Sequence, residues 1–319
     1  MVVFDVALIV PTVTFLIVVI GIAGNLLSFI VFLRHTSSVN TLLAALSLVD
    51  LTLLLFTIPV FFFSHIGAVG ATLYSHVLNY LYPVNLMMQT CSIYIMVLIT
   101  IERWTAVCKP LQVRIWCTAR TTRNALAGVI IFAFLYNIVR FLEYSVDYTP
   151  DGTRTYAINL RNFTTHPHYM FGYYTGLYLL THFLIPFGVF IIMNGHVCKS
   201  IIKLRRARQM LTRQQQREQS TTMMLLVVTL IFAVCNTLPF LLNLAECWDH
   251  TLFNNDKTQY WAYAVNDLSN SLVALNSATT FIVYFAFSEK YRHTAARFLL
   301  RCCCCCYSFP KDVKYNQRC

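Results

Sequence analysis

Four polar side chains stand inside long apolar stretches of the sequence. Asp50 is ionisable, and Asn25, Ser92 and Asn276 occupy comparable positions in three other stretches. An ionisable residue at membrane depth is costly and indicates a functional site by default. If the four side chains meet, their carboxylate, hydroxyl and amide oxygens suit a hard monovalent or divalent cation. A polar switch between two states, or hydrogen bonds that only join helices, are the alternatives.

A second candidate is the pair Glu102-Arg103, near the end of the third apolar stretch. An arginine at this depth needs an acidic or a functional partner, and the adjacent Glu102 supplies a charge-assisted bond. We interpret Arg103 as a switch residue that Glu102 holds in one state and that is released toward a cytoplasmic partner in another. Prolines in the second, third, fifth and sixth apolar stretches permit kinks in helices: Pro59, Pro83, Pro186 and Pro239.

Acidic residues gather in the connecting segments that hold few basic residues. They are Glu143, Asp147, Asp151, Glu246, Asp249 and Asp256, with Asp267 just inside the last apolar stretch. An acidic mouth attracts a cationic ligand, and ordinary solvation of loops is the alternative.

Most of the 12 cysteines lie in apolar stretches or basic segments, which argues against a disulfide framework. Five of them form an unbroken run after Ser288–Leu300, a segment with the pattern of an amphipathic helix: Cys302, Cys303, Cys304, Cys305 and Cys306. Cysteines beside such a helix are candidates for S-palmitoylation, which pins the helix to lipid. Free thiols are the alternative.

Asn162-Phe-Thr164 is an acceptor sequence for glycosylation in the longest acidic segment. His166 and His168 follow it, but two ligands alone are a weak indication of a metal site.

The elements that must position these residues are membrane-spanning helices. Of the 319 residues 57% are hydrophobic and only 12% are charged, about half the ~25% of a soluble domain. Stretches long enough to cross ~30 Å of hydrocarbon lie near residues 5–33, 41–64, 76–107, 123–144, 170–200, 221–247 and 259–286.

The basic residues predict an orientation for these seven spans. The net charge is +11, and most of it lies in alternate connections, from Arg34 through Lys199–Arg217 to Arg318. The other connections hold only Arg154, Arg161 and Lys257, with Arg140 close by. Because basic loops stay in the cytoplasm, we place the N-terminus outside and the C-terminus inside a plasma-membrane protein. The charge therefore indicates topology, and no nucleic-acid partner is expected.

We predict an all-α membrane protein with two parts. Residues 1–287 form a seven-transmembrane helix bundle, and residues 288–319 form a short cytoplasmic amphipathic helix and a Cys-rich tail. An enzyme is not expected, because the sequence holds no GxSxG, P-loop or HExxH motif. A transporter or channel would need an internal repeat or a continuous polar path, and the sequence has neither.

Nearly the whole chain resembles the rhodopsin-like (class A) G-protein-coupled receptors. The matching motifs follow the family's order: Gly24-Asn25, Leu46 to Asp50, Glu102-Arg103-Trp104 in place of DRY, Pro110-Leu111, Pro186, Pro239, Asn276-Ser277 and Tyr284. The resemblance implies activation of a heterotrimeric G protein, with Glu102, Arg103 and Tyr284 in the activation step.

A narrower resemblance, to invertebrate FMRFamide-type neuropeptide receptors, rests on Tyr82–Ala125, Phe232–Glu246 and Asn276–Arg292. It implies an extracellular amidated peptide that ends in Arg-Phe-amide, with no cofactor beyond a sodium ion near Asp50. We expect the charge partners of the peptide's arginine among the acidic residues Glu143, Glu246, Asp249 and Asp267. The alternative is a rhodopsin-like chemoreceptor for a small molecule.

The chain departs from the family's pattern at several positions. Residues 145–169 contain no cysteine, so the usual disulfide of the outer loop cannot form. Thr280 precedes Tyr284 without the Asn and Pro of NPxxY, Asn236 stands in place of the sixth-helix Trp, and Asn194 in place of the fifth-helix Tyr. The family's activation route through those side chains therefore does not carry over intact.

Overall fold

Seven helices long and apolar enough to cross a membrane make up most of the protein. The computed structural model describes residues 2–34, 37–62, 76–148, 156–160, 166, 168–207, 213–248, 252 and 258–306. Within these residues the spans are 9–33, 38–62, 77–108, 119–142, 171–203, 226–246 and 259–287. Each overlaps one predicted stretch, so the prediction of a seven-span helical bundle is confirmed.

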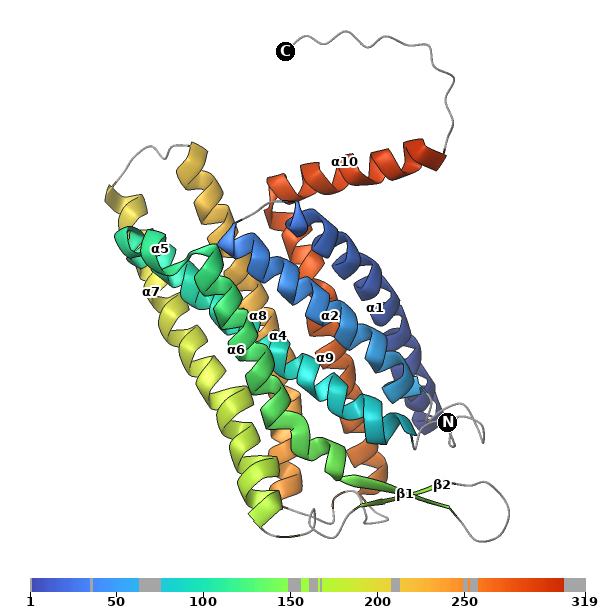
Figure 1. Ribbon diagram of the computed structural model, residues 1–319. Coiled ribbons are helices and arrows are strands. Elements are labelled where there is room, and N and C mark those ends of the chain that lie inside the picture. Colours follow the sequence, from blue (N-terminus) through green and yellow to red (C-terminus); the bar gives the residue numbers. More distant parts are fainter. Residues whose placement is uncertain are drawn as a thin grey trace.

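The spans are built from the following elements (Figure 1): α1 (Val2–Leu33), α2 (Ser38–Phe62), η2 (Val77–Leu81) with α4 (Tyr82–Cys108), α6 (Ala119–Asn137) with η3 (Ile138–Leu142), η5 (His168–Leu177) and η6 (Leu179–Leu184) with α7 (Ile185–Ala207), α8 (Arg213–Trp248) and α9 (Gln259–Phe287). The short helix α5 (Pro110–Trp116) follows α4, and α10 (Glu289–Cys306) follows the last span. Helices suit the lipid core because they satisfy their backbone hydrogen bonds internally.

A small antiparallel hairpin lies at the end of the bundle opposite α10 (Figure 1). β1 (Tyr144–Tyr148) pairs with β2 (Tyr156–Leu160), with Tyr144 opposite Leu160. The sequence analysis predicted only helices, so the hairpin is an addition to that prediction. Apolar residues alternate with polar or small ones in both segments, the pattern of a strand that buries one face.

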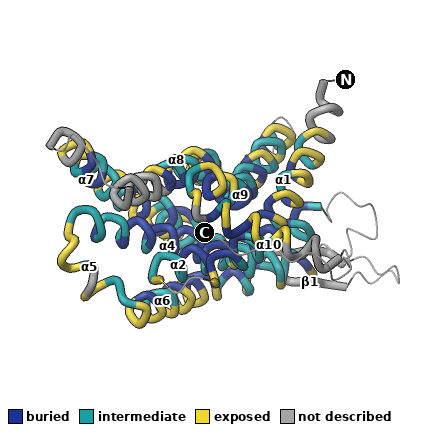
Figure 2. Tube along the Cα trace, turned by 90° about the horizontal axis from the view of Figure 1, so that it is seen from above, coloured by how far each residue is buried: buried dark blue, intermediate teal, exposed yellow. Residues whose placement is uncertain are grey.

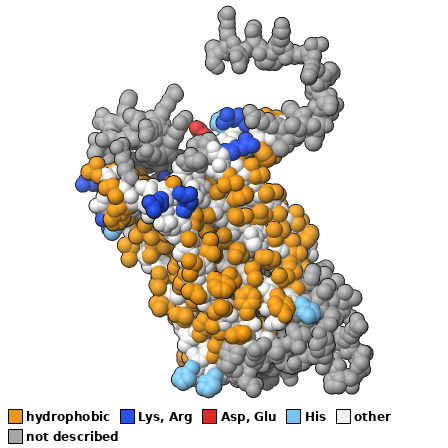
Figure 3. All heavy atoms as spheres, in the orientation of Figure 1, with side chains coloured by type: hydrophobic (Ala, Val, Ile, Leu, Met, Phe, Trp, Pro, Cys, Tyr) orange, Lys and Arg blue, Asp and Glu red, His pale blue; other side chains and the backbone are white. Residues whose placement is uncertain are grey.

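The core of the bundle surrounds α4, which contacts α2, α6, α7 and α8. Its side chains Ile95 and Ile99 are each 1% exposed, and Phe232 of α8 packs in the same apolar cluster. Figure 2 shows buried residues concentrated on α2 and α4 and exposed ones along the outer side of α6. The exposed residues of α6 include Ile131 and Leu135, so the flank that meets lipid is apolar (Figure 3).

Two prolines mark the places where wide π-helical turns give way to α-helix. Tyr82 and Ile185 donate their N–H groups to the carbonyls five residues before them, Val77 and Leu180. The next residue in each case, Pro83 or Pro186, has no N–H and cannot continue this pattern.

In the fifth span another helix satisfies the carbonyl that the proline leaves. Continuing the wide register past Ile185 would direct a donor from position 186 to the carbonyl of Thr181. That carbonyl instead accepts the hydroxyl of Tyr94 of α4, at 3.0 Å. A side-chain donor thus replaces the missing backbone donor inside the membrane.

Glycines allow α1 and α9 to pack closely. A Cβ atom added to Gly21 would lie 2.6 Å from the Cβ of Ala278 and 3.0 Å from its Cα. At Gly24 the added atom would lie 2.0 Å from the ring of Phe281. Small residues at such contacts let helix backbones approach in the absence of a hydrophobic driving force.

We expect Gly21→Ala to lower the thermal stability of the purified protein, because overpacking at a contact with backbone costs about 1–3 kcal/mol. Gly128 of α6 is the matched control, since an added Cβ there meets nothing within 4 Å. Gly128→Ala should leave stability unchanged or raise it by up to about 1 kcal/mol through helix propensity. Equal melting temperatures for the two variants would contradict this account of the α1–α9 contact.

Candidate functional site

The carboxylate of Asp50 joins three spans near the middle of the bundle. Asp50 is 1% exposed, and its Oδ1 accepts hydrogen bonds from Ser92 Oγ at 2.8 Å and Ser277 Oγ at 3.1 Å. Asn25 of α1 donates from Nδ2 to the carbonyl of Ser277 at 2.9 Å. The structure therefore brings Asn25, Asp50 and Ser92 together, and Ser277 connects them.

We predicted Asn276 as the fourth member of this group, whereas its neighbour Ser277 makes the contact with Asp50. Successive residues of a helix differ by about 100° in direction, and Ser277 is the one whose side chain bonds to Asp50. The carbonyl of Asn276 accepts a hydrogen bond from Thr280 Oγ1 at 3.2 Å. One carboxylate and two hydroxyls are oxygen ligands of the kind that a hard cation prefers. Sodium binding beside Asp50 stays a prediction.

A second group of polar side chains lies at the end of the bundle near α10. Glu102 is buried, with 8% of its surface exposed. Tyr284 is 0% exposed, and its ring meets that of Phe32 edge-to-face with centroids 5.1 Å apart. Within the described residues the hydroxyl of Tyr284 has no hydrogen-bond partner. A buried hydroxyl without a partner raises the free energy of the state that contains it. Such a hydroxyl suits a group that gains a partner in another state.

Helix α10 is fixed to α1 beside this group. The hydroxyl of Tyr291 lies 2.8 Å from Ser28 Oγ, and burial raises the pKa of Tyr291. The guanidinium of Arg34 lies over the ring of Phe298, 5.0 Å from its centroid. The predicted helix from Ser288 is thus observed and extends through the cysteine run, although the side chains of Cys302–Cys306 lie outside the described part.

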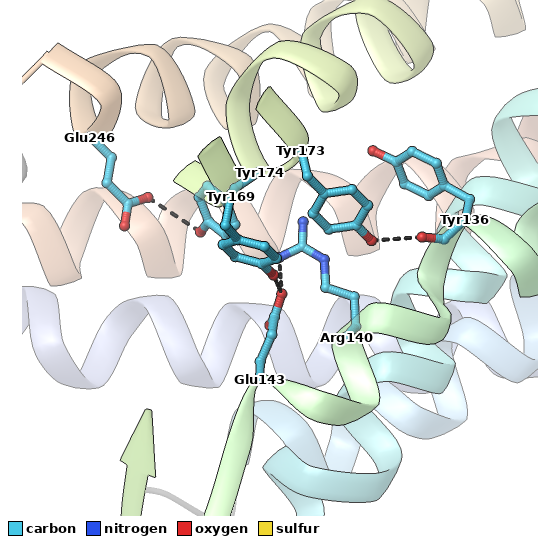
Figure 4. A network of polar contacts seen from close by, with 7 residues as sticks. All are labelled: Tyr136, Arg140, Glu143, Tyr169, Tyr173, Tyr174 and Glu246. Carbon is cyan, nitrogen blue, oxygen red and sulfur yellow. Dashed lines mark hydrogen bonds and ion pairs between the residues drawn. The ribbon is translucent and has the colours of Figure 1, made fainter. Parts of the chain in front are cut away.

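A buried ion pair occupies the opposite end of the bundle (Figure 4). Arg140 of η3 and Glu143, just after η3, are 5% and 4% exposed, with Nη1 and Oε1 2.7 Å apart. The guanidinium lies over the rings of Tyr173 and Tyr174, 5.2 Å and 4.7 Å from their centroids. We call Arg140, Glu143, Tyr169, Tyr173 and Tyr174 the arginine cage.

The tyrosines of the cage connect the fourth span to the fifth. Tyr169 donates its hydroxyl to Glu143, and Tyr173 donates to the carbonyl of Tyr136 at 2.6 Å. Burial, reinforced by the bond to Glu143, raises the pKa of Tyr169, so this hydroxyl stays a donor at neutral pH. Because Glu143 and Tyr169 lie on either side of residues 144–168, a segment without cysteine, their hydrogen bond joins its two ends.

The four acidic residues that we predicted as ligand contacts differ in their surroundings. Glu143 is paired with Arg140, a contact that their spacing of three residues on one helical turn could have indicated. Glu246 of α8 accepts the hydroxyl of Tyr174 at 3.3 Å (Figure 4). Asp267 is half-buried in α9. Asp249 lies outside the described residues, as does the glycosylation acceptor Asn162.

A further polar network, which the sequence analysis missed, joins the third, fourth and fifth spans. The ring of His182 lies 3.0 Å from Thr90 Oγ1 through Nε2 and 2.9 Å from Thr181 Oγ1 through Nδ1. Asn137 of α6 donates from Nδ2 to Thr90 Oγ1 at 3.0 Å. No group of three His, Cys, Asp or Glu side chains suited to a metal occurs among the residues that the structure describes.

We expect Glu143→Gln to destabilise the protein, because breaking a buried ion pair from one side costs about 3–5 kcal/mol. The double variant Arg140→Gln with Glu143→Gln holds no unpaired buried charge, so it should melt above the Glu143→Gln single variant. Thermal unfolding in detergent measures both. Additive losses in the double variant would show that the two side chains do not depend on each other.

Comparison with known proteins gives relatives over most of the chain. A family model described as "7 transmembrane receptor (rhodopsin family)" matches residues 24–285. The chain is 55% identical over 286 residues to the FMRFamide peptide receptor frpr-18 of Caenorhabditis elegans, covering 87% of this chain and 66% of that protein. It is 29% identical over 286 residues to the FMRFamide receptor of Drosophila melanogaster, covering 86% of this chain and 50% of that protein.

A third relative is the probable G-protein coupled receptor frpr-1 of Caenorhabditis elegans, 26% identical over 299 residues, with 86% of this chain and 74% of that protein covered. The chain spans less than two thirds of the length of the first two relatives.

Proposed function

The chain belongs to the rhodopsin family of seven-transmembrane receptors, and on that premise we propose that it binds an extracellular amidated neuropeptide and activates a heterotrimeric G protein. The observation that carries the proposal is the 55% identity to a protein named as an FMRFamide peptide receptor. The family is one of receptors and not of enzymes. A peptide ending in Arg-Phe-amide supplies one guanidinium, which needs a carboxylate in the receptor.

Glu246 is the first choice for that carboxylate, with Asp267 and Asp249 as further candidates. Glu143 already has a guanidinium partner, since Arg140 lies 2.7 Å away within the cage. A ligand's arginine at Glu143 would have to displace Arg140 from its carboxylate. Glu246 belongs to the sixth span, where a ligand can act on α8 directly.

The aromatic packing between the fifth and sixth spans gives a route from ligand to G protein. Phe183 of η6 stacks on Phe240 of α8 with centroids 4.0 Å apart, and Phe187 lies 6.0 Å from Phe232. These rings flank Pro239, where α8 can bend. A cation at Glu246 would favour one of two arrangements of these rings, and the far end of α8 would move with them.

We propose that the end of the bundle with α10 faces the cytoplasm. In Figure 3 the Lys and Arg side chains in view gather at this end, and they belong to the segments whose basic residues predicted this orientation. On this arrangement Arg103, at the inner end of the third span, faces the G protein, and palmitoylation of Cys302–Cys306 would fix α10 to the inner leaflet.

The orientation has a direct test in intact cells. An epitope tag after Cys319 should bind antibody only after permeabilisation, whereas a tag before Met1 should bind without it. Equal staining of the C-terminal tag on intact and permeabilised cells would show the opposite topology. It would also place the arginine cage and Glu246 on the wrong side for an extracellular ligand.

A rhodopsin-like chemoreceptor for a small molecule remains the second candidate. The family membership supports both candidates, while the names of the relatives favour the peptide. A response to small odorants, together with silence toward all Arg-Phe-amide peptides, would decide for the chemoreceptor.

A calcium or cAMP readout in transfected cells tests the peptide proposal. We expect Phe-Met-Arg-Phe-amide or a longer Arg-Phe-amide peptide to activate the chain, and Glu246→Gln to lower its potency about tenfold or more through loss of a charged hydrogen bond. Glu289→Gln is the matched control, since Glu289 is exposed at the other end of the bundle. Equal potency at Glu246→Gln and Glu289→Gln would exclude Glu246 as the partner of the arginine.

A further inference from the structure

Tyr174 lies between two opposite charges that belong to different spans. Its ring lies under the guanidinium of Arg140, 4.7 Å from it, and its hydroxyl donates to Glu246 at 3.3 Å (Figure 4). We infer that Tyr174 is a positioning residue, which orients the carboxylate of Glu246 toward the ligand's arginine and is itself held in place by Arg140. The inference rests on the proposed function and adds a determinant of its specificity.

The orientation of Glu246 matters because a flexible carboxylate binds a guanidinium well in only one geometry. Two parallel N–H···O bonds require both oxygens of the carboxylate to lie in the plane of the guanidinium. The hydroxyl of Tyr174 contacts Oε2 of Glu246. A donor on that oxygen restricts the rotation of the side chain and so lowers the entropy that binding must remove.

The position of Tyr174 is fixed from the other side by the arginine cage. Arg140 is held by Glu143 at 2.7 Å and is 5% exposed, so it cannot leave without breaking the ion pair. A cation over the face of a phenol attracts the ring and withdraws electron density from it. The hydroxyl of Tyr174 therefore becomes a stronger donor toward Glu246, as expected of hydrogen-bonded groups that polarise one another.

A second tyrosine of the arginine cage, Tyr173, serves as the control for this role of Tyr174. Tyr173 also places its ring against Arg140, at 5.2 Å, but its hydroxyl donates to the backbone carbonyl of Tyr136. Tyr173 and Tyr174 thus make the same contact with the cation and differ in the partner of the hydroxyl. Replacement by phenylalanine keeps each ring and removes only the hydroxyl.

The experiment compares Tyr174→Phe with Tyr173→Phe, using Phe-Met-Arg-Phe-amide or, if that is silent, the most potent Arg-Phe-amide peptide of the panel. A second form of the peptide carries citrulline, the neutral isostere of arginine. We expect Tyr174→Phe to lower the potency of the arginine peptide about tenfold and to change the citrulline peptide far less. Tyr173→Phe should leave the ratio of the two potencies as in the unchanged chain. Surface labelling of each variant corrects for expression.

The other outcomes contradict the role of Tyr174, the contact at Glu246 or the proposed function. An unchanged or increased arginine-to-citrulline ratio at Tyr174→Phe overturns the inference, and so does an equal fall in that ratio at Tyr173→Phe. If Glu246→Gln abolishes the preference for arginine while Tyr174→Phe leaves the arginine-to-citrulline ratio unchanged, the inference fails and the proposed function stands. If Glu246→Gln leaves the preference intact, the proposed contact at Glu246 fails. Silence toward all Arg-Phe-amide peptides overturns the proposed function and the inference together.

Discussion

Inside a lipid bilayer no water is available to bond a carbonyl, a hydroxyl or a charge, so the bundle must supply partners from its own side chains. The contacts of Asp50 with two hydroxyls, of the Thr181 carbonyl with Tyr94, and of Arg140 with Glu143 all meet this requirement. In the first two cases the partners belong to different helices. Arg140 and Glu143 instead lie three residues apart. That pair is local, and the tyrosines of η5 extend it to the next span.

These polar contacts divide the bundle into a fixed part and a part that can rearrange. The Asp50 group joins α1, α2, α4 and α9, and the His182 network adds α6 and η6. Between the fifth and sixth spans, besides the hydrogen bond of Tyr174 to Glu246, phenylalanine rings meet: Phe183 stacks on Phe240, Phe187 is tilted against Phe232, and Phe190 meets Phe232 edge-to-face. Hydrogen bonds fix direction, whereas stacked apolar rings can slide with less loss of contact energy. This distribution suits a receptor in which α8 moves against a stable set of helices.

The spans were predictable from the sequence because a run of about twenty mainly apolar residues is typical of a membrane-spanning helix. The meeting of Asp50 with Ser92 was also predictable, since a lone carboxylate in lipid must find donors. Ser277 was missed because the helical phase of α9 relative to Asp50 depends on packing and not on spacing along the chain. The pairing of Glu143 with Arg140 was missed because Arg140, three residues before Glu143, was assigned to the topology signal. A ligand contact at Glu143 stays a prediction. The hairpin of β1 and β2 was missed because two short alternating segments carry little weight beside seven long apolar ones.

The wide turns of η5 and η6 set the rotational phase of everything before them in the fifth span. A π-helical turn accommodates more residues than an α-helical one, so each such turn rotates the preceding segment relative to α7. If the wide register were kept, removing one residue there would turn the preceding segment away from its present direction, and Tyr173 and Tyr174 would no longer face Arg140. The length of this stretch therefore matters to the arginine cage as well as the identity of its tyrosines, because a shorter stretch in the same wide register would direct the same aromatic groups elsewhere.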